Sequence, residues 1–154
     1  MDMKLSEKGL EFLKEKEGVR NHVYDDGSGF LTGGIGHKLI GQELEDYELG
    51  SFVPDCQVDE WLRNDVAVAV RCVNNWVVVD LTQTGFDMLV SLVFNIGCEA
   101  FKKSTLLRRL NRGQIKESGE EFKKWIFSNK RRTAGLTARR AEESQKFLEA
   151  ETHG

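Results

Sequence analysis

The 154-residue sequence lacks several features that define whole classes of protein. No apolar run approaches the roughly 18–20 residues that a membrane-spanning helix needs. The first seven residues, Met1 to Glu7, lack the apolar stretch of a secretory signal, so we expect the chain to be made and folded in the cytoplasm. No internal repeat or low-complexity linker interrupts the sequence, so we expect one domain over residues 1–154.

Cysteine and histidine are scarce and widely spaced. The three cysteines, Cys56, Cys72 and Cys98, suit neither a disulfide framework nor a zinc site, and we expect buried free thiols. The three histidines form no His-Glu-x-x-His pair, and neither common glycine-rich phosphate motif is present. Metal-dependent hydrolysis and nucleotide binding are therefore poor candidates for the function of this chain.

The net charge of −3 conceals a strong asymmetry. Residues 1–101 carry 8 basic and 18 acidic side chains, whereas residues 102–140 carry 13 basic and 3 acidic ones. The basic segment is compatible with a nucleic acid, with an anionic cell-wall polymer or with a solvated helical surface. The charge alone leaves these three interpretations open.

Hydrophobic periodicity predicts an α+β fold with one helix, a small sheet and five further helices. The first helix is expected over residues 6–17, capped by Ser6 and stopped by Gly18. Short strands are expected near residues 22–24, 30–32 and 37–40. The later helices are expected at residues 58–73, 82–96, 104–113, 114–127 and 136–150.

The helix at residues 58–73 is long enough to join two lobes, with a cleft for an elongated substrate between them. We expect a β-rich lobe over residues 18–56 and an interlobe helix over residues 57–74. Residues 1–17 would join residues 80–154 in a larger helical lobe.

Two carboxyl groups are candidates for acid–base chemistry. Glu17 ends the first helix, where the helix dipole disfavours an anion, so its carboxyl is expected to keep a proton and act as a general acid. Asp26 lies in a hydrated Asp-Asp-Gly turn and is expected to stay ionised. One protonated and one ionised carboxyl are what glycoside hydrolysis requires. Each is also ordinary in its place, as a surface glutamate and a turn aspartate.

The spacing of these residues matches a known pattern. Glu17, Asp26 and Thr32, followed by Gly34-Ile35-Gly36-His37, resemble the signature of the phage-type lysozymes, including the endolysins of T-even phages. The resemblance spans most of residues 10–142. Motifs similar to the family's later helices are Asn64-Asp65-Val66, Phe94-Asn95-x-Gly97, Phe101-x-x-Ser104 and Gly135-Leu136-x-x-Arg139-Arg140.

The resemblance implies a lysozyme-like fold and a peptidoglycan hydrolase that cuts the N-acetylmuramyl–N-acetylglucosamine β-1,4 linkage with inversion. Glu17 would protonate the glycosidic oxygen, Asp26 would activate a water on the opposite face, and Thr32 would help to hold that water. No metal or organic cofactor is implied. The residues expected to contact sugar are Phe94, Asn95 and Ser104.

Two further expectations follow from the resemblance. His37 would form a structural pair with Asp65, so Asp65→Asn should lower stability while largely sparing specific activity. Gly33 stands where the family more often has a β-branched or similar apolar residue. Because glycine weakens a strand, this departure puts the exact position of Thr32 in question.

Large side chains elsewhere have two interpretations each. Tryptophans in helical patterns usually pack in the core, so we assign Trp61, Trp76 and Trp125 to packing and not to sugar stacking. Arg139 and Arg140 either approach the cleft and Glu17 or belong to a solvated basic face.

Two other functions remain alternatives. A lytic transglycosylase would use the same acid without adding water, and a non-catalytic module would bind the cell wall or nucleic acid through residues 102–140. The phage-lysozyme interpretation predicts bacterial peptidoglycan as the partner, with no nucleic acid and no stable membrane insertion. It predicts a monomer that waits in the host bacterial cytoplasm until a holin-type partner releases it to the cell wall.

Overall fold

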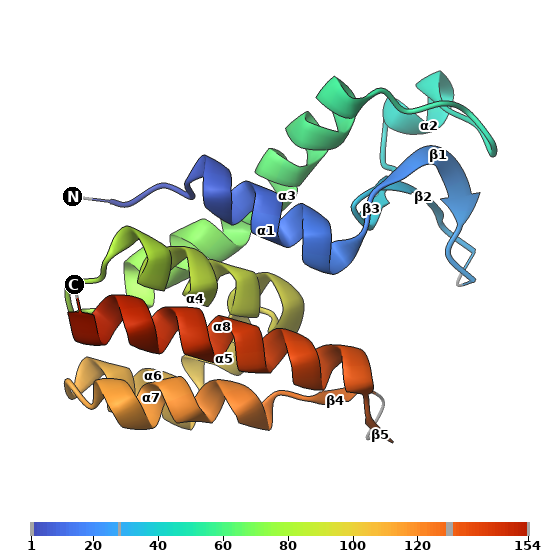
Figure 1. Ribbon diagram of the computed structural model, residues 1–154. Helices are drawn as coiled ribbons and strands as arrows, with labels where there is room; N and C mark the ends of the chain where they lie inside the picture. Colours follow the sequence, from blue (N-terminus) through green and yellow to red (C-terminus); the bar gives the residue numbers. More distant parts are fainter. Residues whose placement is uncertain (1, 28, 129–130, 154) are drawn as a thin grey trace. The chain divides into compact units, whose positions relative to one another are not determined.

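The computed structural model describes residues 2–27, 29–128 and 131–153 (Figure 1). The chain divides into two compact units. The β-containing unit is Glu11–Ala67, and the helical unit combines Met1–Leu10 with Val68–Gly154. Helices α1 (Glu7–Glu17) and α3 (Asp55–Trp76) contribute residues to both units. Helices together with a small sheet confirm the predicted α+β class.

The β-containing unit holds a three-stranded antiparallel sheet in the order β1-β2-β3. Its strands, β1 (Arg20–Asp25), β2 (Leu31–Gly34) and β3 (His37–Lys38), lie where the sequence predicted them. In the register of β1 and β2, Tyr24 opposes Thr32 and Asp25 opposes Leu31. The short helix α2 (Glu43–Asp46), which follows the sheet, was not predicted from the sequence.

The ends of α1 confirm their predicted caps. At its start, the Gly9 N–H donates to the Ser6 hydroxyl oxygen at 3.0 Å. At its end, Gly18 adopts φ 77° and donates its N–H to the Lys14 carbonyl oxygen at 3.0 Å. Only glycine adopts this left-handed conformation without strain, so Gly18 fixes where the helix stops.

Helix α3 begins at Asp55, directly after Pro54, and extends beyond both ends of the helix predicted over residues 58–73. The predicted helix stopped one residue before Asn74. Instead the Asn74 side chain accepts from the Met3 N–H and donates to the Met3 carbonyl, each at 2.9 Å, and the helix continues to Trp76. The apolar stripe of this helix is buried throughout, and its members are Val58, Leu62, Val66, Ala69, Cys72 and Val73.

The helical unit is organised around α8 (Ala134–His153), which packs against α4 on one side and α7 on the other (Figure 1). Phe147 of α8 meets Phe122 with ring centroids 5.2 Å apart, and both rings are fully buried. The other helices are α4 (Gln83–Ile96), α5 (Cys98–Lys102), α6 (Thr105–Asn111) and α7 (Ile115–Glu121).

The predicted helix over residues 114–127 is wrong in its last part. After α7 and a 3₁₀ turn (Phe122–Lys124), the chain forms the hairpin of β4 (Phe127–Ser128) and β5 (Arg131–Arg132). The Thr133 N–H donates to the Ile126 carbonyl at 3.1 Å and closes this hairpin. Helix α5 was also missed, because five residues are too few to show a period.

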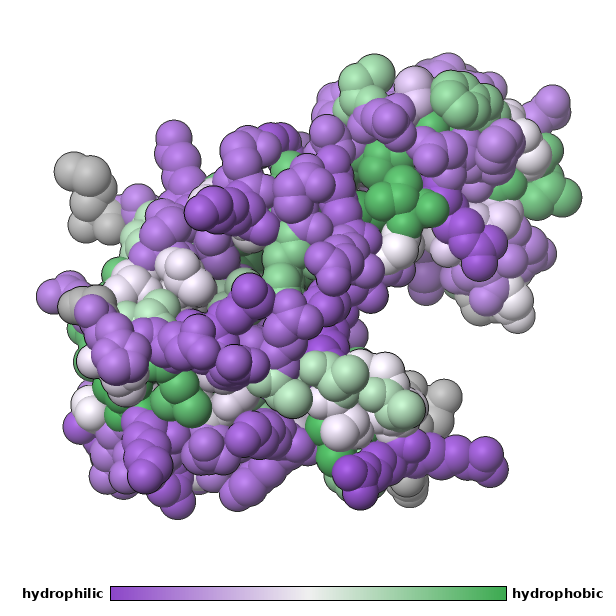
Figure 2. All heavy atoms as spheres, in the orientation of Figure 1, coloured by the Kyte–Doolittle hydropathy of each residue, from purple (hydrophilic) through white to green (hydrophobic). Residues whose placement is uncertain are grey.

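The surface in Figure 2 is mostly hydrophilic, with apolar side chains exposed on the β-containing unit. Within the described residues, no helix has both the length and the apolar character needed to span a membrane. The large apolar residues exposed on this unit include Phe30, Ile40, Leu44, Leu49 and Phe52.

The prediction of buried free thiols is wrong. Cys72 of α3 and Cys98 of α5 form a disulfide with their Cα atoms 5.9 Å apart, and Cys56 is an exposed free thiol. The two half-cystines are 26 positions apart in the sequence. Wide spacing gave no sign of the bond, because only the packing of α3 beside α5 brings the two residues together.

We expect the double substitution Cys72→Ser/Cys98→Ser to lower the free energy of unfolding by about 3 kcal/mol, since the bond closes a loop of 26 residues in the unfolded chain. Thermal unfolding of the double variant, and of the wild type with and without reductant, measures the effect. Cys56→Ser is the matched control and should leave Tm unchanged. A double variant that melts with the wild type would contradict the prediction.

Candidate active site

Glu17 is the last residue of α1, and its side chain is exposed. Its carboxyl stands at the helix end that carries partial negative charge, as the sequence predicted. One turn earlier, the Lys14 ammonium contacts the Asp59 carboxylate of α3 at 2.5 Å, and this hydrogen bond raises the pKa of Lys14. The ion pair fixes the last turn of α1 against α3 and so restricts where Glu17 can lie.

Asp26 and Thr32 are brought together by the register of the β1–β2 hairpin. Tyr24 opposes Thr32, and two residues later the Asp26 N–H donates to the Phe30 carbonyl at 3.3 Å. Alternation along the strands then places the Asp26 and Thr32 side chains on one face, as diagonal neighbours roughly 7–8 Å apart between their Cα atoms.

The two side chains differ in their surroundings. Asp26 is exposed, whereas Thr32 is only 2% exposed. The Thr32 hydroxyl donates to the Phe30 carbonyl at 3.3 Å, which is long for an O–H···O bond. The hydroxyl oxygen keeps the capacity to accept a hydrogen bond, as a residue that orients water requires.

Gly33 is explained by the packing behind the strand. A Cβ at this position would lie 3.1 Å from a ring atom of Trp61 and 3.5 Å from Val53. The absent side chain lets β2 lie directly on the Trp61 ring, which is 3% exposed. Close packing against Trp61 therefore restrains the strand that carries Thr32, contrary to the expectation that glycine would loosen it.

His37 lies between two carboxylates, and its predicted pairing with Asp65 is confirmed. Its Nδ1 is 2.8 Å from Asp65 Oδ2, its Nε2 is 2.9 Å from Glu43 Oε1, and its ring stacks on Trp61 with centroids 4.5 Å apart. Burial acts to raise the pKa of Glu43, but the Ile40 N–H and His37 outweigh it and lower the pKa. The second partner, Glu43, was not predicted from the sequence.

Phe94 and Asn95 lie near the C-terminal end of α4, where Phe94 is half-buried and Asn95 is exposed. Asn95 opens onto a cavity of about 460 Å³ within the helical unit. Trp125, assigned to packing from the sequence, is half-buried and lines this cavity, and Trp76 is 43% exposed. The complete lining is Asn95, Ile96, Lys124, Trp125, Phe127 and Leu136.

Ser104 has a structural use that the sequence also predicted. It caps α6, where its hydroxyl accepts from the Leu107 N–H at 3.1 Å and donates to the Phe101 carbonyl at 2.7 Å. The residue is 6% exposed. Its expected contact with sugar stays a prediction and competes with these two hydrogen bonds.

Known proteins resemble this chain over nearly its full length. The phage lysozyme family model matches residues 14–143. An endolysin of Acyrthosiphon pisum secondary endosymbiont phage 1 is 38% identical over 152 residues, which cover 96% of this chain and 100% of the relative. The chain belongs to the phage lysozyme family. This membership confirms the expectation of a glycosidase that hydrolyses peptidoglycan.

Solved lysozyme structures agree. The muramidase domain of SpmX from Asticaccaulis excentricus matches with a TM-score of 0.82 and 37% identity, over 94% of this chain and 97% of that one. A variant of P22 lysozyme matches with a TM-score of 0.85 and 33% identity, over 95% and 99% of the two chains. The lysozyme-like fold predicted from the sequence is therefore confirmed.

The lysozyme contains a buried ion cluster that the sequence did not reveal. Arg140 and Glu143 are 0% exposed, and Arg140 Nε lies 2.7 Å from Glu143 Oε1. Arg139 is 6% exposed and donates to Glu143 Oε2 at 3.2 Å and to the Ser91 carbonyl at 3.1 Å. Burial raises the pKa of Glu143, although Arg140, Ser91 and Arg139 oppose the rise. The alternative of a solvated basic face is wrong for these two arginines.

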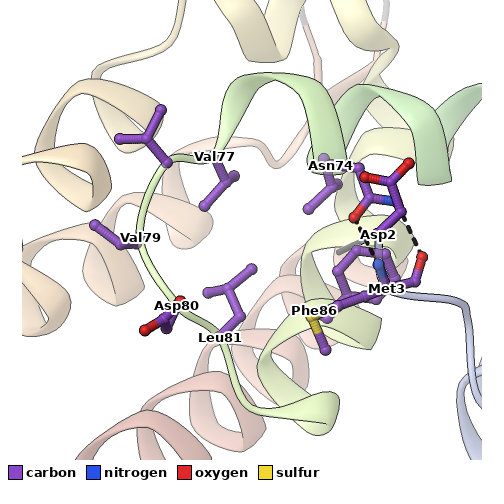
Figure 3. A pocket seen from close by; sticks show the side chains of 10 residues that line it. Asp2, Met3, Asn74, Val77, Val79, Asp80, Leu81 and Phe86 are labelled. Carbon is purple, nitrogen blue, oxygen red and sulfur yellow. Dashed lines mark hydrogen bonds between the residues drawn. The ribbon is translucent and has the colours of Figure 1, made fainter.

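A second cavity of the lysozyme, of about 450 Å³, lies within the helical unit between the N-terminal segment and the loop that follows α3 (Figure 3). Asp2 and Asp80 are its charged lining residues, and valines supply much of the apolar surface. None of the predicted catalytic or sugar-binding residues lines it. Among the described residues, no group of three or more His, Cys, Asp or Glu side chains is arranged to hold a metal ion.

We expect Glu43→Gln to lower the free energy of unfolding at neutral pH. The decrease of this free energy between neutral and acidic pH should be smaller in the variant than in the wild type. Because the folded-state pKa of Glu43 is lowered, its contribution is full above the ordinary value of 4.5 and is lost as the pH falls through the folded value. Urea unfolding at pH 7, 4.5 and 3 measures this. Glu45→Gln, on the exposed face of the same helix, is the control, and parallel pH profiles for all three proteins would refute the prediction.

Proposed function

We propose that this lysozyme cleaves the β-1,4 bond between N-acetylmuramic acid and N-acetylglucosamine in a single displacement with inversion. The observation that carries the proposal is the hairpin register that sets Asp26 and Thr32 on one face. Glu17, from the helix just before the hairpin, is the acid. In inverting glycosidases the two catalytic carboxyls stand roughly 6.5–9.5 Å apart, which leaves room for a water, and the proposal requires this separation of Glu17 and Asp26.

In the proposed reaction Glu17 gives its proton to the glycosidic oxygen as the bond from that oxygen to the anomeric carbon breaks. A water attacks the anomeric carbon from the opposite face and forms the new carbon–oxygen bond. Asp26 accepts the proton that this water loses. The products are a new reducing end of inverted configuration and a glycan end with a free hydroxyl.

Thr32 has the positioning role in this scheme. Its buried hydroxyl lies on a strand packed against Trp61, so it offers the water a fixed hydrogen-bond acceptor beside the exposed Asp26 carboxylate. A water that is already held in place loses less entropy on reaching the transition state, which lowers the activation barrier.

The alternatives explain less of the structure. A lytic transglycosylase needs the acid but no attacking water, so Asp26 and Thr32 would have no use. A binding module would rely on the basic residues 102–140, yet several of these are already paired with acidic neighbours. The pairs include Lys102–Glu99, Lys123–Glu120 and Lys124–Glu121.

The biological setting is proposed by analogy with other phage endolysins. The chain would accumulate as a monomer in the host bacterial cytoplasm and reach the cell wall when a holin-type partner opens the membrane. Cleavage of the glycan strands would then lyse the cell. Peptidoglycan would be its macromolecular partner, and nucleic acid would have no role.

Product analysis of purified peptidoglycan tests the proposal. The wild type should generate new reducing ends and no anhydro ends, because water is the nucleophile. Glu17→Gln should lose about 10²–10⁴-fold in rate, since glutamine cannot supply the proton. Asp26→Asn should fall by a similar factor.

Two neighbouring carboxylates serve as controls. Glu15→Gln changes an exposed residue of the same helix, and Asp25→Asn keeps the oxygen that accepts from the Gly27 N–H at 2.8 Å. Both should retain activity within about threefold. Anhydro ends would assign the chain to the transglycosylases, and undiminished cleavage by Glu17→Gln would remove it as the acid.

A further inference from the structure

The buried ion cluster of α8 extends to a residue of α4. Besides its two contacts with Glu143, Arg140 donates from Nη1 to Oδ1 of Asn95 on α4 at 3.0 Å. Arg140 is fully buried, whereas Asn95 is exposed and lines the 460 Å³ cavity. The cluster thus reaches from the core of the helical unit to the wall of a cavity.

The contact settles which way the Asn95 amide faces. A guanidinium group has five N–H donors and no acceptor, so only the oxygen of an amide can bind it. Because its oxygen accepts the hydrogen bond from Arg140, Asn95 presents its NH₂ group as a donor to the cavity. No acceptor for that nitrogen is found among the residues that the structure describes.

We propose that Arg140 is a positioning residue that makes Asn95 present a hydrogen-bond donor, and no acceptor, to an amide carbonyl of the substrate. This inference rests on the proposed function for its substrate and goes beyond it by assigning the polarity of one subsite. It predicts that the group bound at Asn95 must carry an accepting oxygen.

The cavity suits an amide group. Its other walls are the rings of Trp125 and Phe127, the aliphatic side chains of Ile96 and Leu136, and Lys124, whose ammonium contacts Glu121 at 2.8 Å. An amide carbonyl with an adjoining methyl or methylene group offers one acceptor and an apolar body, which matches the Asn95 donor beside this apolar surface. Peptidoglycan carries such carbonyls in the N-acetyl groups of both sugars and in the peptide stems.

The test is Asn95→Asp, made in the Glu17→Gln background so that bound glycan is not cleaved. Aspartate has the same shape and keeps an oxygen toward Arg140, now as an ion pair, but it replaces the NH₂ donor with an acceptor. Tm should therefore be unchanged or higher. The Kd for soluble peptidoglycan fragments, measured by calorimetry, should rise about 10–100-fold.

Asn75→Asp is the matched control. It adds the same charge at an exposed position of the same unit, where the Asn75 side chain makes no described hydrogen bond. Its Kd should stay within about twofold of the parent. An Asn95→Asp protein that binds as tightly as the parent overturns the proposal, and so does a parent that binds no fragment.

A double-mutant cycle tests whether Arg140 acts through Asn95. Lysine at position 140 keeps the charge beside Glu143 but lacks the fork that reaches both partners. Arg140→Lys should weaken fragment binding several-fold, and this effect should vanish in an Asn95→Ala background. Equal losses in both backgrounds would show that Arg140 has only a structural role.

Fragments with and without peptide stems identify the carbonyl. If the Asn95→Asp penalty persists on stem-free glycan, the partner is an N-acetyl group, and if it disappears, the partner is a stem amide. The experiment is also independent of catalysis. Failure of the wild type to release reducing ends would count against the proposed function, while the binding data would still decide the role of Asn95.

Discussion

The helical unit depends on one constraint, which is that the Arg140 guanidinium is completely buried and must be paired there. A buried charge that loses its partner costs about 3–5 kcal/mol, so the surrounding groups have little freedom. Glu143 supplies the opposite charge from one turn further along α8, and Ser91 and Asn95 reach the cluster from α4. The requirement to pair these groups sets the register of α8 on α4.

The β-containing unit is stabilised by packing of its strands on the Trp61 ring and by the hydrogen bonds of His37 to two carboxylates. The Trp61 ring lies under Gly33 of β2 and stacks on His37 of β3, so one side chain of α3 supports two strands. His37 is fixed in turn by Asp65 and Glu43. The hairpin that carries Asp26 and Thr32 is therefore built on a rigid backing, although Asp26 itself lies in an exposed turn.

Features that depend on local chemistry were predictable from the sequence. Gly18 and Ser6 mark the ends of α1, and the spacing from Glu17 to Thr32 indicated the family and a candidate site within it. Features that depend on distant partners were not predictable. An arginine three residues before a glutamate looks the same on a solvated helix as it does in a core, so Arg140 gave no sign of its burial. A signal did exist in Ser91, a polar residue within the largely apolar helix α4, but it did not identify a partner. The disulfide was also not predicted, because it too depends on a partner distant in the sequence.

Stability alone is a weak explanation for the ion cluster. Buried ion pairs are often no more stable than apolar side chains of the same volume, because desolvation offsets the Coulombic gain. Apolar residues could not fix the orientation of the Asn95 amide. A methionine at position 140 could fill the space, but it would leave the Asn95 amide free to turn either its oxygen or its nitrogen toward the cavity. The guanidinium removes one of these two states. A lysozyme that must recognise a polymer of repeated amide groups gains from a donor whose orientation is decided before the substrate arrives.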